Sequence, residues 1–375
     1  MNFDLTEERQ MLQDTLRRFL KDRYTTENRN KIIESEAGFS ADIWTGLAEL
    51  GVIGALFGED HGGFGGAGFD IAVVFEELGR AGVVEPFLDT AILGGGLIAA
   101  LGTDDQQAMV EQVIGGGLHL AFAHGEPTSR YDLSRVQTTA KAEDDGIVLN
   151  GRKAVVANAE AAGHLIVSAR ESGAADDEAG ISLFLVPAEA KGLTLRGYPM
   201  LSGGRAAEVT LDDVRLPTSA RLGAAGDAFG AIATQVAAAN VALAAETLGA
   251  METATELTRD YLMTRKQFGR PIGTFQALAH RFSDLLIELE QARSAVINAA
   301  GHLDTADRDR QIASARNLIG RAGRLVAEES IQMHGGIAMT QEYELAHIAK
   351  RIVMNDHRFG DTDYHLERFI ALSAA

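Results

Sequence analysis

The stretch from residue 117 to residue 222 is patterned as β-strands, whereas the segments on either side are patterned as helices. Short runs rich in β-branched residues recur in this stretch, and the pairs Asp145-Gly146 and Asn150-Gly151 are typical of tight turns between strands. The later runs read HLIVSAR, ISLFLVP and AEVTLDDVRL. This pattern predicts a compact antiparallel barrel or sandwich.

The two flanking segments follow helical periodicity. Thr6 is placed to cap a helix whose first turn contains Glu7 and Glu8, at the positive end of the helix dipole. Two further helices are predicted, over residues 70–81 and along residues 278–296. Their apolar faces consist of Ile71, Val74, Phe75 and Leu78 in the first, and of Leu278, Phe282, Leu285, Leu289, Ala292 and Val296 in the second.

A length of 375 residues allows two or three domains. We expect an N-terminal α-helical domain over residues 1–116, a middle β domain over residues 117–222, and a C-terminal α-helical bundle over residues 223–375.

Composition narrows the class of protein. With 46% hydrophobic and 23% charged residues the chain is an ordinary soluble globular protein, and the formal net charge of -19 argues against nucleic acid as a partner. The chain has no cysteine, which excludes disulfides and thiolate sites and fits a reducing compartment such as the cytoplasm. Charged residues interrupt the N-terminus too often for a signal peptide or a membrane span, so we expect no membrane partner.

Residues 63–68 match the G-x-G-x-x-G pattern of dinucleotide-binding loops. Such a loop needs a strand before it, a helix after it and a second strand about 20 residues on that carries an acidic residue. Residues 88–102 read LDTAILGGGLIAALG, which is helical, so the second strand is missing. We therefore predict that residues 62–68 only connect two helices.

Other motifs are weak when taken singly. The histidines have no metal-ligand spacing, and His357 and His365 are expected in a solvated polar turn, so no metal site is predicted. No G-x-S-x-G elbow is present. The run RKQFGRP at residues 265–271 fits an ordinary helix end.

In combination, these motifs resemble the acyl-CoA dehydrogenase family along nearly the whole chain. The similar stretches read GEDHGGFGGAGFDIAVVFEELGRAG, AFAHGEPTSRYD, LNGRKAVVANA, RKQFGRPIGTFQALAHR and QMHGGIAMTQEYELAHIAKR. The sequence is most similar to the small subunits of pimeloyl-CoA dehydrogenase-type and steroid-degradation enzymes, in which RYD follows a Glu-Pro pair and an FG-x-x-D-x-H turn lies near the end.

The resemblance implies that the C-terminal domain is a four-helix bundle and that FAD is held non-covalently between the β domain and this bundle. A second subunit would complete the site. Phe122, His124 and Gly125 fall where the family's strand passes the flavin ring, and Ala157 falls where a Thr usually contacts it. Thr362 is assigned to the cofactor as well.

The other cofactor contacts belong to a neighbouring subunit in the family. Arg265 falls where that subunit grips the FAD diphosphate, and Phe268 falls where it packs on the adenosine half, although Phe268 also fits a core position. A guanidinium forks onto diphosphate oxygens, and glycines let backbone approach a phosphate. The contact continues at Gln276, Gln332, Gly335 and Gly336.

The resemblance implies α,β-dehydrogenation of an acyl-CoA thioester, in which a carboxylate removes the α-proton while hydride leaves for the flavin. The family's usual Glu aligns with Gly360, and the alternative positions on an earlier helix align with Ala239 and Asn240. Asp361 could act as the base if the turn is shifted, but a turn aspartate is the simpler interpretation. We interpret Glu246 as structural.

Three interpretations remain. The first is a flavin-binding subunit of a heteromeric acyl-CoA dehydrogenase, in a homo-oligomer or a heterotetramer with a paralogous subunit, with an electron-transfer flavoprotein as acceptor. The second is a flavin oxidase or monooxygenase on the same fold, and the third is a non-catalytic subunit that completes a partner's FAD site. Fatty-acid, steroid or dicarboxylate catabolism would fit, and Arg130 could contact the acyl-CoA substrate or simply lie on the surface.

Overall fold

The computed structural model of the chain describes residues 5–143 and 146–374, so Asp145 of the first predicted turn pair lies outside the described residues. The chain forms two compact units. We call residues 1–32, 67–83 and 240–375 the helical unit, and residues 33–66 and 84–239 the sheet unit. The three-domain boundaries drawn from the sequence stay a prediction.

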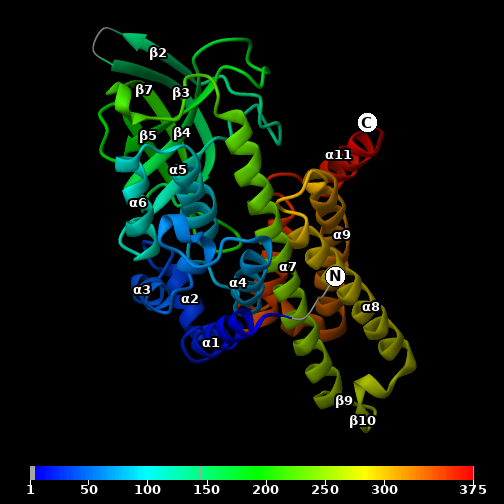
Figure 1. Cartoon of the computed structure of the whole chain (residues 1–375). Coiled ribbons are helices and arrows are strands. Elements are labelled where there is room, and N and C mark those ends of the chain that lie inside the picture. The colour runs from blue at the N-terminus through cyan, green and yellow to red at the C-terminus, as the bar shows by residue number, and fades with distance from the viewer. Residues whose placement is uncertain (1–4, 144–145, 375) are drawn as a thin grey trace. The chain divides into compact units, whose positions relative to one another are not determined.

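The helical unit is built from α-helices, with one short hairpin. The helices are α1 (Glu7–Arg23), α2 (Thr26–Glu34), α4 (Gly68–Ala81), α7 (Phe229–Thr264), α8 (Gln276–Gly301), α9 (Arg308–His334), α10 (Glu344–Asn355) and α11 (Thr362–Ala374), and the hairpin strands are β9 (Lys266–Gln267) and β10 (Arg270–Pro271). Helices α8 and α9 lie side by side (Figure 1). Helices α10 and α11 pack against α9, and α4 packs against α1 and α8. Both α2 and α7 begin in one unit and end in the other.

The helices predicted from periodicity are confirmed. Thr6 caps α1, where its hydroxyl accepts from the backbone N–H of Arg9 at 3.3 Å. The apolar face predicted for residues 70–81 is buried in α4. Along α8 the later part of the predicted seam is buried, whereas Leu278 and Phe282 at its start are half-buried.

Helix α7 is long and apolar enough to cross a membrane by composition alone. Its most apolar 18-residue window has a mean hydropathy of 1.3, and 78% of that window is buried inside the protein. Such burial is typical of the core helix of a globular protein.

The sheet unit begins with helices and continues as strands. The helical elements are α3 (Ala41–Glu49), the 3₁₀ turns η1 (Gly54–Leu56) and η2 (Glu59–His61), the π-helical η3 (Leu88–Gly95), α5 (Gly96–Leu101) and α6 (Asp104–Ile114). The strands are β1 (Leu120–Ala123), β2 (Thr139–Glu143), β3 (Gly146–Ala157), β4 (His164–Arg170), β5 (Ile181–Pro187), β6 (Leu193–Pro199), β7 (Arg205–Leu216) and β8 (Arg221–Leu222).

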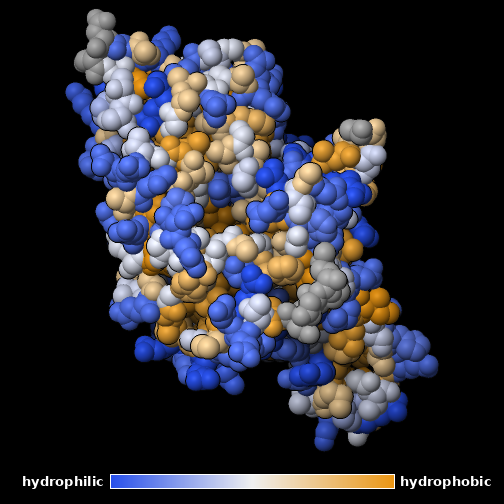
Figure 2. Space-filling view, viewed as in Figure 1, coloured by the Kyte–Doolittle hydropathy of each residue, from blue (hydrophilic) through white to orange (hydrophobic). Residues whose placement is uncertain are grey.

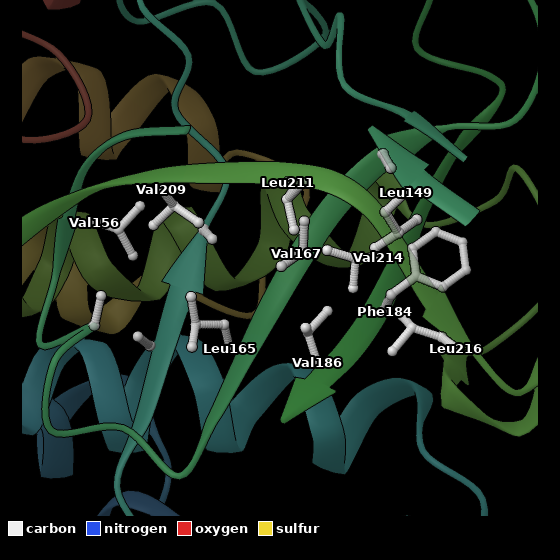
Figure 3. Close-up of a cluster of buried hydrophobic side chains, with 14 of the residues drawn as sticks. Leu149, Val156, Leu165, Val167, Phe184, Val186, Val209, Leu211, Val214 and Leu216 are labelled. Carbon is white, nitrogen blue, oxygen red and sulfur yellow. The ribbon is translucent and has the colours of Figure 1, made fainter. Parts of the chain in front are cut away.

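These strands form one eight-stranded sheet in the order β6-β7-β3-β2-β4-β5-β8, with β1 beside β4. Most neighbours are antiparallel, as predicted, but β1 and β2 both run parallel to β4. Alternate residues of β3, β4, β5 and β7 point inward and form a dry core around Leu149, Leu165, Phe184 and Val209 (Figure 3). This core fixes the position of β1, whose four residues are all buried.

The second predicted turn pair is wrong, because Asn150-Gly151 lies inside β3. The register between β3 and β7 shifts there, as in a β-bulge. The Asn150 side chain bridges to β7, donating to the Asp213 carboxylate and accepting from the Asp213 backbone N–H, both at 2.9 Å. An Asn-Gly pair that favours a turn can equally supply the unusual backbone of a bulge.

Candidate functional site

The glycine-rich loop at residues 62–68 is not built to bind a dinucleotide. Residues 50–67 form 3₁₀ turns and loops and contain no strand. The backbone N–H groups of Gly65 and Gly66 donate to the carbonyls of Phe57 and Ala55, both at 2.9 Å. A Cβ at Gly65 would collide with the Ala55 carbonyl. The glycines therefore serve close backbone packing, and the prediction of a connector agrees with the structure.

Two of the residues expected beside the flavin lie at the end of β1, Phe122 within the strand and His124 directly after it. The rings of Phe122 and His124 stack with centroids 5.3 Å apart and planes 4° apart, and both side chains are buried. The Nδ1 atom of His124 lies 2.9 Å from the Ser168 hydroxyl. Burial, aided by the positive charge of Lys153, lowers the pKa of His124 to about 3. The ring is therefore neutral at pH 7.

A buried ion pair that the sequence reasoning did not single out supports this strand end. Lys153 is fully buried, and its Nζ donates to Glu126 Oε1 at 2.8 Å, to the Ser168 hydroxyl at 3.0 Å and to the His124 carbonyl at 3.2 Å. Burial lowers the pKa of Lys153 to about 8, although Glu126 opposes this shift. Lys153 follows Asn150 and Arg152 in the same strand, so no sequence signal distinguished it as the buried charge.

Both carboxylate oxygens of Glu126 accept hydrogen bonds. Besides Lys153, it accepts from the backbone N–H of Gln137 at 2.8 Å and from the N–H and hydroxyl of Thr138 at 2.9 and 2.7 Å. Burial alone would raise the pKa of Glu126, but Lys153 and these hydrogen bonds hold it below its usual value. The network ties the segment after β1 rigidly to β3.

Ala157 and Gly125 lie in the same neighbourhood as Phe122. The backbone N–H of Ala154 donates to the Gly125 carbonyl at 2.8 Å. One residue past Ala157, the amide of Asn158 donates to the Leu120 carbonyl at 3.2 Å. The structure thus brings the predicted flavin residues of β1 and β3 together within the sheet unit.

Arg130 lies on the exposed loop after this strand end. Its backbone is left-handed, with φ at +50°, and its guanidinium carbon lies 5.4 Å from the centre of the Tyr131 ring. The side chain is exposed. A contact with the substrate stays a prediction.

A second group of predicted residues lies at one end of the helical unit. Helix α7 ends at Thr264, and the β9–β10 hairpin that follows turns at Phe268 and Gly269, with φ at +52° and +80°. Phe268 is 91% exposed, so the alternative that it is a core residue is wrong within this chain. Arg265 is exposed at the base of the hairpin, where its carbonyl accepts from the Ile272 N–H at 2.8 Å.

Two aromatic rings join this hairpin to the Gly335-Gly336 corner. Tyr261, one turn before Arg265, stacks on His334, which ends α9, with ring centroids 4.5 Å apart. His334 is buried, and its ring nitrogens lie 2.8 Å from the Ser330 carbonyl and 3.1 Å from the Tyr343 hydroxyl. The hairpin and the corner are therefore held as one exposed surface.

This surface has the chemical groups that the predicted diphosphate contact requires, and the contact itself stays a prediction. A Cβ built on Gly335 or Gly336 would meet no other atom of the described chain within 4 Å, so the backbone of the corner is open to a ligand. A nearby exposed guanidinium and open backbone suit phosphate oxygens, and an exposed phenyl ring suits a flat adenine. The predicted Gln276 and Gln332 are exposed as well, at the start of α8 and in the last turn of α9.

The expected base position lies in the turn between α10 and α11. Gly360 is buried, with φ at +121°, and its carbonyl accepts from Arg316 Nη2 at 3.2 Å. The Asp361 carboxylate accepts from the Tyr364 N–H at 2.9 Å and so caps α11. The Thr362 hydroxyl lies 3.1 Å from the Asp356 carboxylate. A catalytic role for Asp361 and a cofactor contact for Thr362 stay predictions.

The other candidate positions carry no free carboxylate. Ala239 and Asn240 are buried on α7. Glu246 is buried too, in an ion pair with Arg351 and with the Asn355 amide donating to it at 3.0 Å. This agrees with the structural role predicted for Glu246.

One expectation about this turn is wrong. His365 is 2% exposed rather than solvated, whereas His357 is exposed. The first turn of α11 carries His365 inward, which spacing along the sequence did not reveal. No group of three or more His, Asp or Glu that could hold a metal ion occurs in residues 5–143 and 146–374.

Models of all three acyl-CoA dehydrogenase domains match this chain. The N-terminal domain matches residues 6–114, the middle domain residues 121–214 and the C-terminal domain residues 226–371. The chain belongs to the acyl-CoA dehydrogenase family. Membership confirms the expected fold, with N-terminal helices, a middle β region and a C-terminal helical domain, and the expected class of FAD-dependent oxidoreductase.

Individual members are similar over most of their length. The acyl-CoA dehydrogenase FadE12 of Mycobacterium tuberculosis is 30% identical, covering 82% of this chain and 81% of the relative. The solved structure of a variant of the Tcur3481-Tcur3483 steroid ACAD is 31% identical over 98% of both chains, with a TM-score of 0.88. The FAD complex of PigA is 25% identical over 100% of this chain and 99% of the other, with a TM-score of 0.92.

Proposed function

We propose that this acyl-CoA dehydrogenase family member is the flavin-binding, base-lacking subunit of a heteromeric acyl-CoA dehydrogenase. The observation that carries the proposal is Gly360, a residue without a side chain at the position expected for the base. The neighbouring Asp361 is engaged as a helix cap, and Glu246 is held in an ion pair. An unlike partner chain would then supply the carboxylate.

The chain's own residues would bind and orient the cofactor. The neutral stack of Phe122 on His124 would lie along the flavin ring of the chain's own FAD. Arg265 and the Gly335-Gly336 corner would hold the diphosphate of the FAD of a second subunit. When bound, FAD supplies the centre that accepts the hydride from the β-carbon of the thioester. The buried Lys153–Glu126 pair would keep the strand end rigid, so that the cofactor meets a fixed surface.

An oligomer follows from this arrangement, because the residues at the exposed end of the helical unit would grip the cofactor of a second subunit. Exposed apolar residues also lie over α8, where Figure 2 shows hydrophobic side chains at the surface. A shallow groove there is lined mainly by Leu286, Ile287, Ala295 and Leu318. The similar steroid ACAD is named after two components, Tcur3481 and Tcur3483, which supports the proposal that this chain too assembles with an unlike partner.

The reaction would need an electron acceptor such as an electron-transfer flavoprotein, and the acyl-CoA could meet Arg130 on its exposed loop. The absence of cysteine fits a cytoplasmic location.

The test follows flavin absorbance under anaerobic conditions. The chain purified alone and loaded with FAD should be yellow and should not bleach with butyryl-CoA, whereas a complex with a paralogous chain that bears the Glu should bleach. Rapid bleaching by the chain alone would contradict the proposal. Failure to bind FAD in either form would favour the non-catalytic subunit. If oxygen is then admitted to protein with reduced flavin, flavin reoxidation coupled to substrate oxygenation would favour a monooxygenase.

A further inference from the structure

The turn at Gly360 has no room for a side chain. A Cβ built on Gly360 would lie 2.6 Å from Nε2 of His365 and closer still to Cδ1 of Tyr364. Its φ of +121° is strained for any residue with a Cβ. Two independent features therefore favour glycine at this position: its positive φ, and the lack of space for a Cβ.

The two residues that fill this space are held in place. Both lie in the first turn of α11, where the Tyr364 N–H donates to the Asp361 carboxylate at 2.9 Å and the His365 N–H donates to the Asp361 carbonyl at 3.0 Å. Their rings pack edge to face, with centroids 5.3 Å apart and planes 81° apart. Arg316 pins the other side of the turn by donating to the carbonyls of Asn355 and Gly360.

His365 is almost fully buried, and its packing against Tyr364 helps to hold the ring in place. Burial, with the nearby Arg316 and Arg368, lowers the pKa of His365 to about 3, so the ring stays uncharged.

We propose that Tyr364 and His365 close the base position of this chain, so that no carboxylate at residue 360 could reach a substrate. The meaning of this closure rests on the proposed function, in which another chain provides the base. Tyr364 and His365 are then specificity-determining residues, because they restrict the chain to the base-lacking role. The missing side chain at Gly360 is therefore a consequence of the conformation and packing of the whole turn. Replacing this one residue would not restore a base.

A double-mutant cycle tests the closure through thermal stability alone. Gly360→Ala is made in the FAD-loaded protein and again in Tyr364→Ala and His365→Ala backgrounds, and the unfolding midpoint is compared. The backbone strain that Gly360→Ala introduces at positive φ is the same in every background, so it cancels when the backgrounds are compared. A difference between backgrounds in the effect of Gly360→Ala therefore reports the steric contact with Tyr364 or His365. Gly269→Ala is the matched control, because Gly269 also has positive φ, at +80°, but a Cβ there would meet no atom within 4 Å.

We expect Gly360→Ala to lower the unfolding midpoint by several degrees more than Gly269→Ala does. In the Tyr364→Ala or His365→Ala background, Gly360→Ala should lower the midpoint by clearly less than it does in the otherwise unchanged protein. Equal losses in all backgrounds would overturn the proposal. If one truncated background fails to fold, the other still decides it.

A second arm measures anaerobic flavin reduction by butyryl-CoA. Gly360→Glu alone should give no gain in rate, and a gain with this single change would overturn the closure. A third outcome is possible, in which steric coupling is found but butyryl-CoA reduces the flavin of no variant, including the one that combines Gly360→Glu with Tyr364→Ala and His365→Ala. The closure is then supported and the proposed function fails.

Discussion

The ring of Tyr261 stacks on the ring of His334, with centroids 4.5 Å apart and planes 26° apart, and thereby joins two stretches separated by 73 positions in the sequence. Tyr261 lies one turn before Arg265, and His334 directly precedes Gly335. The stack therefore holds a guanidinium and an open backbone corner on one surface. Such a pairing is what a diphosphate needs.

Replacing Arg265 by Ala should weaken FAD binding by about tenfold to about a hundredfold, because a hydrogen bond to a charged group contributes about 1.5–3 kcal/mol. Flavin fluorescence titration of the apoprotein measures the change. Arg270→Ala is the matched control on the same hairpin, since the Arg270 guanidinium lies over the Phe275 ring at 4.2 Å. Equal losses for the two variants would contradict a specific role for Arg265.

Tyr261 and His334 should act as positioning residues for the same contact. Tyr261→Phe keeps the stack and should bind FAD nearly normally, whereas Tyr261→Ala should weaken binding by about threefold to tenfold, since an aromatic pair contributes about 0.5–1.5 kcal/mol. Titrations of both variants, compared at equal folded fraction by circular dichroism, check this. If Tyr261→Ala lowers stability and leaves FAD affinity intact, the stack is only structural.

Periodicity predicted the helices well, because burial of one face is a local property of the sequence. The face of α4 through Val74 and the Thr6 cap could be predicted for this reason. The Asn150-Gly151 pair was misassigned because its partner, Asp213, is distant in sequence. The burial of His365 and the Lys153–Glu126 pair likewise depend on contacts that spacing along the chain cannot reveal.

The exposed apolar side chains of α8 should lie in a subunit interface. Ile287 is 59% exposed in the single chain and lies beside Leu286. In the proposed interface both side chains would be covered by a second subunit, so Ile287→Glu would bury a charge there and should shift the protein toward smaller assemblies. Light scattering of the FAD-loaded protein reports the mass. Met11→Glu, at a residue 67% exposed on α1, is the control. A wild-type monomer with a full complement of flavin would contradict the oligomer.

Stability should fall on acidification from about pH 6.5 toward pH 4. Burial lowers the pKa of His119 to about 4 and those of His124 and His365 to about 3, so at these three sites the unfolded chain binds more protons than the folded chain in this range. Each histidine lowers the free energy of unfolding as the pH falls, and together they are expected to outweigh Glu76, whose pKa burial raises to about 7 and which acts in the opposite direction.

His119 offers a single-site check of this pH dependence. Its ring packs against Trp44 and Phe39, and its Nδ1 has no partner among the described residues. His119→Phe should keep the packing and reduce the loss of melting temperature between pH 7 and pH 5. His357→Phe, at an exposed histidine, should leave that loss unchanged. An unaltered loss in His119→Phe would show that burial does not shift this group.

The central claim is that the chain binds flavin but lacks a base of its own, and proton exchange at the substrate tests it most directly. The FAD-loaded chain is incubated anaerobically with butyryl-CoA in D₂O, and deuterium at the α-carbon is measured by mass spectrometry. A positioned base typically contributes about 10²- to 10⁴-fold to proton removal. We predict no uptake above the protein-free control for the chain alone, and rapid uptake once a Glu-bearing partner is present. Rapid uptake by the chain alone that Asp361→Asn abolishes would contradict the account and identify Asp361 as the base.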